Sequence, residues 1–417
     1  MAGIRKVQIW ENLMLDTVTP GRSVAELIKG IKVIDVDTHL SEPHDMWTSR
    51  APAKWKDRVP QVIDDSNGNK RWMIDGNRYM GVSSACSVVH RDGRQAEGVD
   101  FTSWQVDDVH PACSDTKARI ALMDEIGVHA QIVYANVMGF AGQGRGEANS
   151  KALPPMDEDL RLISTQIFND AMGEMQAESG DRLLPMAMMP WWDIKLAMAE
   201  AERCFTMGMR GININSDPHT HGMQDLSGEY WYPLWELCQD RNIPVNFHIG
   251  ASDASMSWYG DTPWPSQSPA HKLSIGGTMM FISNARVVCN IIASGMLDRF
   301  PALKFVSVES GIGWLPFILE ALQYQMDTSS SHRYELTALE YFRRQMYGCF
   351  WFENQDSADS IRKLGVDNVL FETDFPHPTC LFPDPFGKVA DGIAQLTEAE
   401  RRKVMSTNAA ALYNIAI

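Results

Sequence analysis

The chain has 417 residues, of which 44% are apolar and 22% are charged. This balance is typical of a folded protein with a large core, and it excludes a disordered or collagen-like chain. Lysine and arginine number 37 against 53 acidic residues, which gives a formal charge of −16. Nucleic acids and anionic membranes attract proteins with a positive surface, so we expect a small-molecule substrate and neither of these partners.

The amino-terminal segment, the lengths of the apolar runs and the cysteines predict the cellular compartment of the protein. Its sequence, MAGIRKVQIWENLMLD, lacks the apolar core of a secretory signal, and no window of the chain reaches 18 uninterrupted apolar residues. The seven cysteines are an odd number without close pairs, which suits reduced thiols better than disulfides. These features predict a cytoplasmic protein.

Short apolar runs, most of them leading into an amphipathic helix, recur along the chain. Apolar strands that alternate with helices indicate a parallel sheet buried on both faces, in the α/β class. Eight such units are the number at which the sheet closes into a (β/α)8 TIM barrel. An open, doubly wound sheet is the alternative, because a count of strands does not prove closure. The predicted strands are Val33 to Asp37, Ala130 to Tyr134, Leu183 to Met189, Arg210 to Asn215, Val245 to His248, Phe305 to Glu309, Cys349 to Glu353 and Val369 to Asp374.

Apolar residues at spacings of three and four predict the helices between these strands. The predicted helices are Leu160 to Glu178, Ile194 to Met207, Tyr230 to Gln239, Ser283 to Leu297, Gly313 to Met326, Ser357 to Leu364 and Glu398 to Tyr413, and one more runs between caps at Asp115 and Gly127.

The chain exceeds a minimal barrel of about 250 residues by roughly 170. We assign residues 1–30 to an amino-terminal extension and residues 31–417 to a single barrel domain. Residues 40–113 form a long insertion after the first strand, on the side where barrels build active sites. Within it, Asp75-Gly76 is a good turn between two β-prone runs at 70–80, so the insertion is predicted to act as a lid.

Polar residues stand at the carboxyl ends of the predicted strands. The first strand ends in Asp37 and His39, which point to the same side because strand residues alternate. The fifth strand ends in His248 and the eighth in Asp374. Strand ends converge on one mouth of a barrel, so these four residues predict a site for a divalent metal. Two imidazoles with two carboxylates suit Zn, Mn or Fe better than Ca or Mg.

Five ordered motifs give the chain a resemblance to a known family. They are VIDVDTHLSEP at 33–43, PVNFHIG at 244–250, LKFVSVESGIGWLP at 303–316, LFETDFPHP at 370–378 and STNAAALYNI at 406–415. The chain resembles the amidohydrolase superfamily, in the branch with aminocarboxymuconate semialdehyde decarboxylase and γ-resorcylate decarboxylase. This resemblance implies that Asp37, His39, His248 and Asp374 bind the metal.

The sequence departs from that family at two positions. The first member of the strand-one pair is usually His or Glu, and here it is Asp37. The sixth strand usually ends in a catalytic His, and here it ends in Glu309. A carboxylate at this position acts as a general base, ligates the metal or bridges to a second metal. We therefore place Glu309 among both the metal and the catalytic candidates, and Asp374 or Glu309 would move the proton.

Other polar and aromatic residues near the strand ends complete the predicted site. Glu42 either orients His39 or caps the chain turn at Pro43. His377 is a candidate for catalysis, for substrate binding or for a second metal. Arg71 on the predicted hairpin could bind a substrate carboxylate, and Trp258 could wall an apolar pocket.

These residues predict a metal-dependent enzyme that hydrolyses or decarboxylates a small aromatic or unsaturated carboxylic acid, with Zn or Mn as its metal. The first alternative is a dinuclear non-haem oxygenase using Fe or mixed Mn/Fe, which resembles 2-aminoisobutyrate hydroxylase. The second is a non-catalytic partner subunit of such an assembly. Apolar helix faces make a homo-oligomer, or a hetero-oligomer with a related subunit, the expected assembly.

Overall fold

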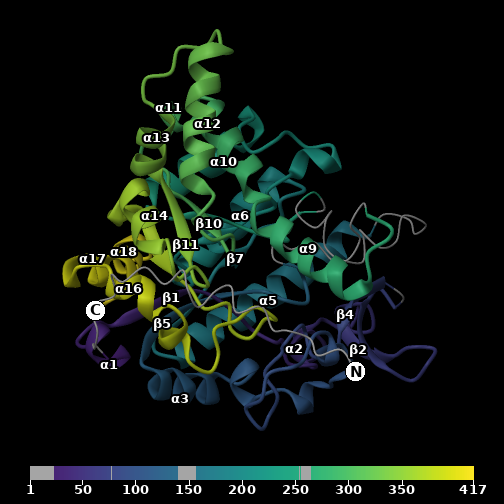
Figure 1. The fold of residues 1–417 in the computed structure, drawn as a ribbon. Coiled ribbons are helices and arrows are strands. Elements are labelled where there is room, and N and C mark those ends of the chain that lie inside the picture. Colours follow the sequence, from purple (N-terminus) through teal and green to yellow (C-terminus); the bar gives the residue numbers. More distant parts are fainter. Residues whose placement is uncertain (1–22, 77, 140–155, 253, 255–263) are drawn as a thin grey trace.

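Parallel strands lie at the centre of the molecule (Figure 1), and their backbone hydrogen bonds form a ring of eight strand positions. The computed structural model describes residues 23–76, 78–139, 156–252, 254 and 264–417. One part of the ring is a sheet in the order β1-β5-β6, and the other runs in the order β12-β11-β10-β9-β8-β7. The strands are β1 (Val33–His39), β5 (Val128–Tyr134), β6 (Leu183–Pro185), β7 (Ala187–Met188), β8 (Ile212–Asn213), β9 (Val245–His248), β10 (Phe305–Val308), β11 (Met346–Phe350) and β12 (Val369–Phe371).

Backbone hydrogen bonds join the two sheets at both ends. Only Met186 separates β6 from β7, so these two short strands together occupy one of the eight strand positions. The amide of Met186 donates to the carbonyl of Val133 on β5. At the other joint, the amide of His39 donates to the carbonyl of Phe375 at 2.7 Å, and the amide of Asp374 donates to the carbonyl of Asp37 at 2.9 Å. The ring is therefore a closed (β/α)8 barrel, as the sequence predicts, and the doubly wound alternative is wrong.

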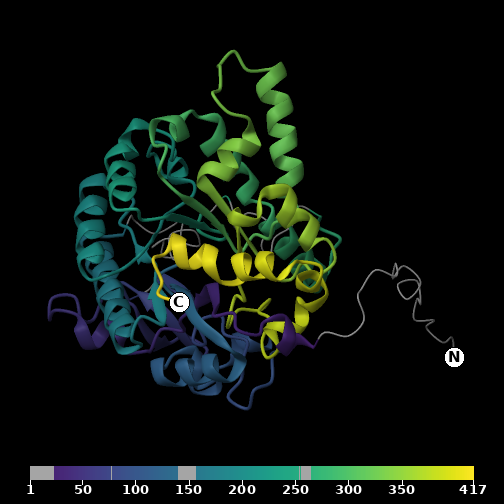
Figure 2. The same cartoon turned by 90° about the vertical axis from the view of Figure 1, so that its left-hand side faces the viewer.

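Helices surround the ring on its outer side (Figures 1 and 2). Most follow the predicted boundaries within a few residues, and α12 extends beyond the other helices at the top of Figure 1. The longer helices are α3 (Thr116–Ile126), α5 (Glu158–Glu178), α6 (Ile194–Thr206), α7 (Tyr232–Asp240), α9 (Pro269–Phe281), α10 (Asn284–Ala293), α12 (Leu315–Thr328), α13 (Ala338–Gln345) and α14 (Ser357–Leu364). Short helices are α1 (Val24–Leu27), α2 (Met46–Arg50), α11 (Met296–Arg299), α15 (Pro385–Lys388), α16 (Ala390–Ala394), α17 (Glu398–Arg402) and α18 (Asn408–Leu412).

The structure corrects several predicted elements. The seventh strand is Met346–Phe350 rather than Cys349 to Glu353, because α13 leads directly into it. The predicted last helix consists of α17, one π-helical turn and α18. Neither α9 nor α13 was predicted. A capping box at Thr337 and Glu340 marks the start of α13 and is a signal that the sequence offers.

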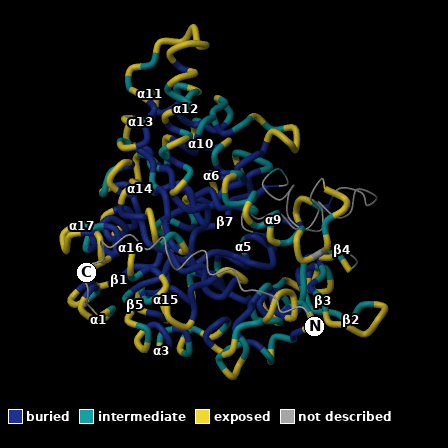
Figure 3. The backbone as a smooth tube through the Cα atoms, in the orientation of Figure 1, coloured by how far each residue is buried: buried dark blue, intermediate teal, exposed yellow. Residues whose placement is uncertain are grey.

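The insertion after β1 builds its own small sheet beside the barrel mouth. The predicted hairpin is present as β3 (Lys70–Ile74) and β4 (Arg78–Val82), and β2 (Gln61–Asp64) adds a third, unpredicted strand. Trp72 and Met80 are buried in the main core. Figure 3 shows the buried backbone concentrated in the barrel, with exposed segments on the outer helices and the tip of this sheet.

One helical stretch of the described chain, residues 270–293, is long and apolar enough to cross a membrane by length and composition alone, and one third of it is buried. It covers most of α9 and all of α10. One face of α10 packs into the core through Val287, Val288, Ile291 and Ile292, so this part of the stretch belongs to the barrel wall. From α9, the apolar residues Leu273, Met280 and Phe281 line a pocket described below.

Candidate metal centre

Two imidazoles meet at the barrel mouth from opposite strands. The Nε2 atoms of His39 on β1 and His248 on β9 lie 3.2 Å apart. The Nδ1 atom of His39 lies 3.1 Å from the carbonyl oxygen of Ala135, and that of His248 lies 2.6 Å from the carbonyl oxygen of Ile249. A carbonyl only accepts, so both Nδ1 atoms carry a hydrogen, and in the neutral form of the rings both Nε2 atoms present lone pairs toward each other. A cation bound by both Nε2 atoms would remove the repulsion between their lone pairs.

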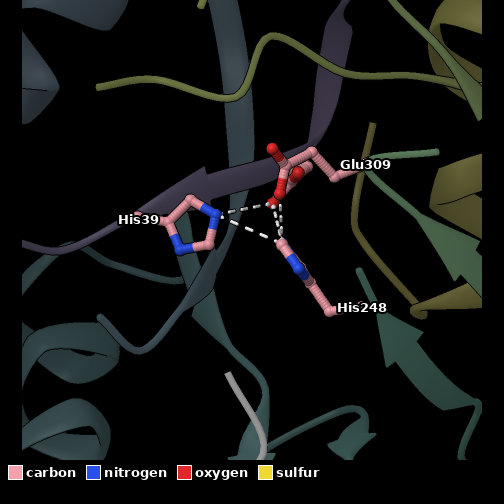
Figure 4. A group of neighbouring side chains, drawn as sticks. His39, His248 and Glu309 are labelled. Atoms are coloured by element: carbon pink, nitrogen blue, oxygen red, sulfur yellow. Dashed lines mark hydrogen bonds and ion pairs between the residues drawn. The ribbon is translucent and has the colours of Figure 1, made fainter. Parts of the chain in front are cut away.

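Carboxylates surround the same point. Asp37 Oδ1 lies 3.4 Å from the Nε2 atoms of both His39 and His248, and Asp374 Oδ1 lies 3.6 Å from His39 Nε2. Glu309 Oε2 lies 3.4 Å from His248 Nε2, and Figure 4 shows His39, His248 and Glu309 pointing toward one another. All five side chains are at least nine-tenths buried.

Several of these oxygen atoms lack hydrogen-bond donors. Both carboxylate oxygens of Asp37, Oε2 of Glu309 and Oδ1 of Asp374 accept no hydrogen bond from the described residues. A buried charged oxygen without a donor is costly unless a cation compensates for it. The donor set of imidazole nitrogens and carboxylate oxygens fits Zn, Mn or Fe, so the cluster is suited to a divalent metal.

The ligand atoms form two overlapping groups, and the atoms of each group lie within 4.8 Å of one another. One consists of Asp37, His39, His248 and Glu309, and the other of His39, Glu309, Asp374 and His377. The structure thus brings together every residue predicted for metal binding and every residue predicted for catalysis.

Backbone conformation places two of the carboxylates. Glu309 and Asp374 have φ values of 52° and 57°, in the left-handed region that side chains other than glycine's rarely adopt. The amide of Glu309 donates to Glu372 Oε2 at 3.3 Å. Such strained positions cluster at functional sites, where the surrounding structure holds them.

Burial and mutual repulsion change the acidity of the cluster. Burial, together with the charge of Asp37, raises the pKa of Asp374 to about 8. Burial and the neighbouring carboxylates of Asp374 and Asp37 raise the pKa of Glu309 well above its usual value. Burial also opposes ionisation of Asp37, but the adjacent imidazoles of His248 and His39 outweigh it and lower the pKa of Asp37. Burial, with the nearby His377, lowers the pKa of His39 to about 4.

His377 is held beside the cluster by a relay of hydrogen bonds. Its ring stacks on that of His39 with the centroids 3.7 Å apart, and its Nδ1 lies 2.9 Å from Asp374 Oδ1. Its Nε2 lies 2.7 Å from Asn136 Oδ1. Glu42 Oε1 accepts the amides of Asn136 and Val137 at 2.8 and 2.9 Å. Glu42 therefore holds the chain after β5.

One predicted residue, Arg71, is not part of this arrangement. Arg71 donates to the carbonyl of Thr102 at 3.4 Å and lies 3.6 Å from Asp65, away from the cluster. Trp258 lies outside the described residues.

Three residues near the cluster were not predicted. Thr379 donates to Asp374 Oδ2 at 2.9 Å, and Asn136 and Glu372 hold His377 and Glu309 as described above. A carboxylate within the apolar run VLFETD was the sequence signal for Glu372.

A cavity of about 420 Å³ opens beside the cluster. Glu309 and His377 line its inner end together with Thr379. Its walls come from the insertion and from α9, and they are mainly apolar: Cys86, Val88, Ala96, Gly98, Val99, Phe101, Leu273, Ser274, Gly277, Thr278, Met280 and Phe281.

A closed (β/α)8 barrel with a buried His/carboxylate cluster at the carboxyl ends of its strands defines a metal-dependent TIM-barrel enzyme. Comparison with known proteins identifies the particular family. The model of the family described as Amidohydrolase matches residues 34–415, so the chain belongs to the amidohydrolase family.

Individual relatives include decarboxylases. γ-Resorcylate decarboxylase of Polaromonas sp. (strain JS666 / ATCC BAA-500) is 25% identical over 315 residues, which cover 71% of this chain and 86% of that protein. An amidohydrolase structure from Mycobacterium avium subsp. paratuberculosis K-10 matches with a TM-score of 0.66 and 22% identity, over 92% and 99% of the two chains. A dihydroxybenzoic acid decarboxylase structure from Polaromonas sp. JS666, with bound manganese and the inhibitor 2-nitroresorcinol, matches with a TM-score of 0.55 and 18% identity, over 92% and 97%.

Proposed function

We propose that this protein is a divalent-metal-dependent decarboxylase of a small aromatic or unsaturated carboxylic acid. The observation that carries the proposal is the joint position of the cluster and the cavity. The four predicted ligands meet at the inner end of an apolar pocket, and Glu309 lies at the boundary between the two. The decarboxylases among the relatives, one of them with bound manganese, support the same reaction.

Asp37, His39, His248 and Asp374 would hold the metal, and Mn or Zn fits this donor set. The bound cation would supply a positive anchor for the substrate's carboxylate. The Nδ1–H groups of both imidazoles donate to backbone carbonyls, which fixes the rings and directs both Nε2 atoms inward.

Glu309 would provide the proton that replaces the carboxyl group. The bond between the substrate carbon and the carboxylate breaks, its electron pair stays on that carbon, and carbon dioxide leaves. The Glu309 carboxyl group donates its proton to the same carbon and then takes a proton from water. The nearby carboxylates of Asp374 and Asp37 favour the protonated form of Glu309, which suits a general acid. His377 would hold Asp374 in place through the contact at 2.9 Å.

Hydrolysis uses the same site with Glu309 as a base that activates water, and it is the second candidate. Its support is the position of Glu309 Oε2 beside His248 at 3.4 Å. The decarboxylases among the relatives give no support to the oxygenase alternative. The intact set of converging side chains argues against a non-catalytic subunit. Cytoplasmic localisation and assembly into an oligomer stay predictions.

The test is release of carbon dioxide by the full-length protein after chelation and reloading with Mn or Zn. A panel of aromatic monocarboxylic acids that includes 2,6-dihydroxybenzoate provides the substrates. Metal-dependent release by the wild-type protein, and none by Asp374→Asn, supports the proposal. Equal turnover by the chelated protein, or hydrolysis of amides or esters with no decarboxylation of any acid, contradicts it.

A further inference from the structure

The cavity beside the metal centre has two chemically different ends. Glu309, His377 and Thr379 make its inner end polar, whereas the walls from the insertion and α9 are lined mostly by carbon atoms and small side chains. At about 420 Å³ it has the size of a small-molecule site. A substrate held by its carboxylate at the inner end therefore has an apolar space for the rest of its body.

Gly277 lines this space and leaves room in it because it has no side chain. It lies in the interior of α9, where glycine destabilises a helix relative to alanine. Its backbone does not have a positive φ, and a Cβ atom added there would meet nothing within 4 Å. Neither backbone geometry nor packing against neighbours requires glycine at this position. The position does line the cavity, so a side chain there would occupy the space open to a substrate.

The charged side chains that line the cavity affect which substrates can bind. No lysine or arginine is among the described residues that line the cavity, so none of these residues offers a cation to an anionic group of the substrate. Arg71, which is predicted to bind a carboxylate, instead lies beside Asp65 and the carbonyl of Thr102. A second anionic group on the substrate would lose water here without gaining a cation.

We propose that this cavity makes the enzyme specific for monocarboxylic acids with an uncharged, apolar body, and that Gly277 is a specificity-determining residue. The inference rests on the proposed function, because the substrate's carboxylate is assigned to the metal centre. It adds that the body of the substrate packs between α9 and residues 86–101 of the insertion, and that substrates with a second carboxylate are rejected.

Equilibrium dialysis with Mn-loaded, full-length protein tests this with three probes: benzoate, biphenyl-4-carboxylate and biphenyl-4,4′-dicarboxylate. We expect biphenyl-4-carboxylate to bind about tenfold or more tightly than benzoate, because its second ring is buried against apolar walls. We expect the dicarboxylate to bind at least about tenfold more weakly than biphenyl-4-carboxylate.

Variants at Gly277 locate the effect. In Gly277→Leu, benzoate should bind as in the wild type, while the advantage of the second ring falls to about twofold or less. Gly277→Ala fills less space and favours the helix, so it should give a partial loss without loss of stability if the leucine variant does not fold. Ala270→Leu places the same leucine side chain at an exposed position of α9 that does not line the cavity, and it should leave the binding of all three probes unchanged.

Two results would overturn the proposal: a dicarboxylate that binds as tightly as the monocarboxylate, or a second-ring advantage that survives in both Gly277 variants. A different result would contradict the proposed function without contradicting the specificity of the cavity. If benzoate binds equally well to chelated and Mn-loaded protein, the carboxylate is not at the metal centre, and the ring advantage still reports on the cavity.

Discussion

The Nε2 atoms of His39 and His248 face each other at 3.2 Å, and in the neutral form of the rings neither carries a hydrogen, because each ring donates through Nδ1 to a backbone carbonyl. Two lone pairs at this distance repel unless a cation lies between them. Asp37 Oδ1, at 3.4 Å from both nitrogen atoms, completes an arrangement that a divalent metal would stabilise.

Removal of one imidazole is therefore expected to remove the metal. His248→Ala should weaken Mn and Zn binding by about 100-fold or more, because the ligand itself is lost and not only a group that orients it. Competition with a chromogenic chelator measures the affinity, and elemental analysis measures the bound metal. His332→Ala, at an exposed histidine, is the control. Unchanged affinity in His248→Ala would show that His248 is not a ligand.

Glu309→Gln is expected to separate catalysis from metal binding. The amide keeps the shape of the side chain but loses the proton donor, so kcat should fall by about 10²–10⁴-fold. Metal content should stay at the wild-type level, since four other residues are proposed as ligands. The exposed Glu320 provides the matched control Glu320→Gln. A variant that keeps full activity would exclude Glu309 as the acid, and a variant without metal would make it a ligand.

The metal-free protein should lose stability as the pH rises from 6.5 to 8.5. The pKa of Asp374 is raised to about 8 in the fold, above its value in the unfolded chain. The folded state thus holds a proton that the unfolded state has lost, and stability falls as the pH rises toward 8. The lowered pKa of His39, about 4, acts mainly between pH 4 and the ordinary histidine pKa near 6.5, which is the lower edge of this window.

Thermal unfolding at several pH values, with and without Mn, measures this effect. The metal should abolish most of the pH dependence above pH 6.5, because it replaces the proton as the partner of the carboxylates. Calorimetry in buffers of different ionisation enthalpy should show protons released on metal binding at pH 7 and fewer at pH 9. No proton release at pH 7 would contradict a protonated cluster.

Glu42→Ala is expected to affect the site through Asn136 and His377. Loss of the carboxylate leaves the amides of Asn136 and Val137 without their acceptor, which costs about 1–3 kcal/mol for each buried group. The unfolding free energy should fall accordingly, and kcat should fall because Asn136 no longer holds His377. Glu42→Gln keeps an accepting oxygen and should restore both quantities in large part. If both variants behaved alike, the hydrogen bonds would not be the cause.

The sequence by itself determined the barrel and the core of the site. Eight apolar runs that alternate with helices predict a parallel sheet, and the barrel brings all strand ends to one mouth. The alternation of strand residues puts Asp37 and His39 on one side, and the ends of the fifth and eighth strands add His248 and Asp374. These predictions hold because they depend on local periodicity and on one rule of barrel geometry.

Only the tertiary structure decided which groups surround that core. Asn136 contacts His377 across 241 residues of sequence, and no local pattern links two such loop residues. Arg71 stands on the predicted hairpin, yet the hairpin directs it to Asp65 and Thr102. The helix α9 contains two adjacent glycines and has no clear apolar face in its sequence, and it forms the cavity wall with residues of an insertion nearly 200 positions earlier. The direction of a loop is set by long-range packing, whereas the direction of a strand residue is set by its own alternation.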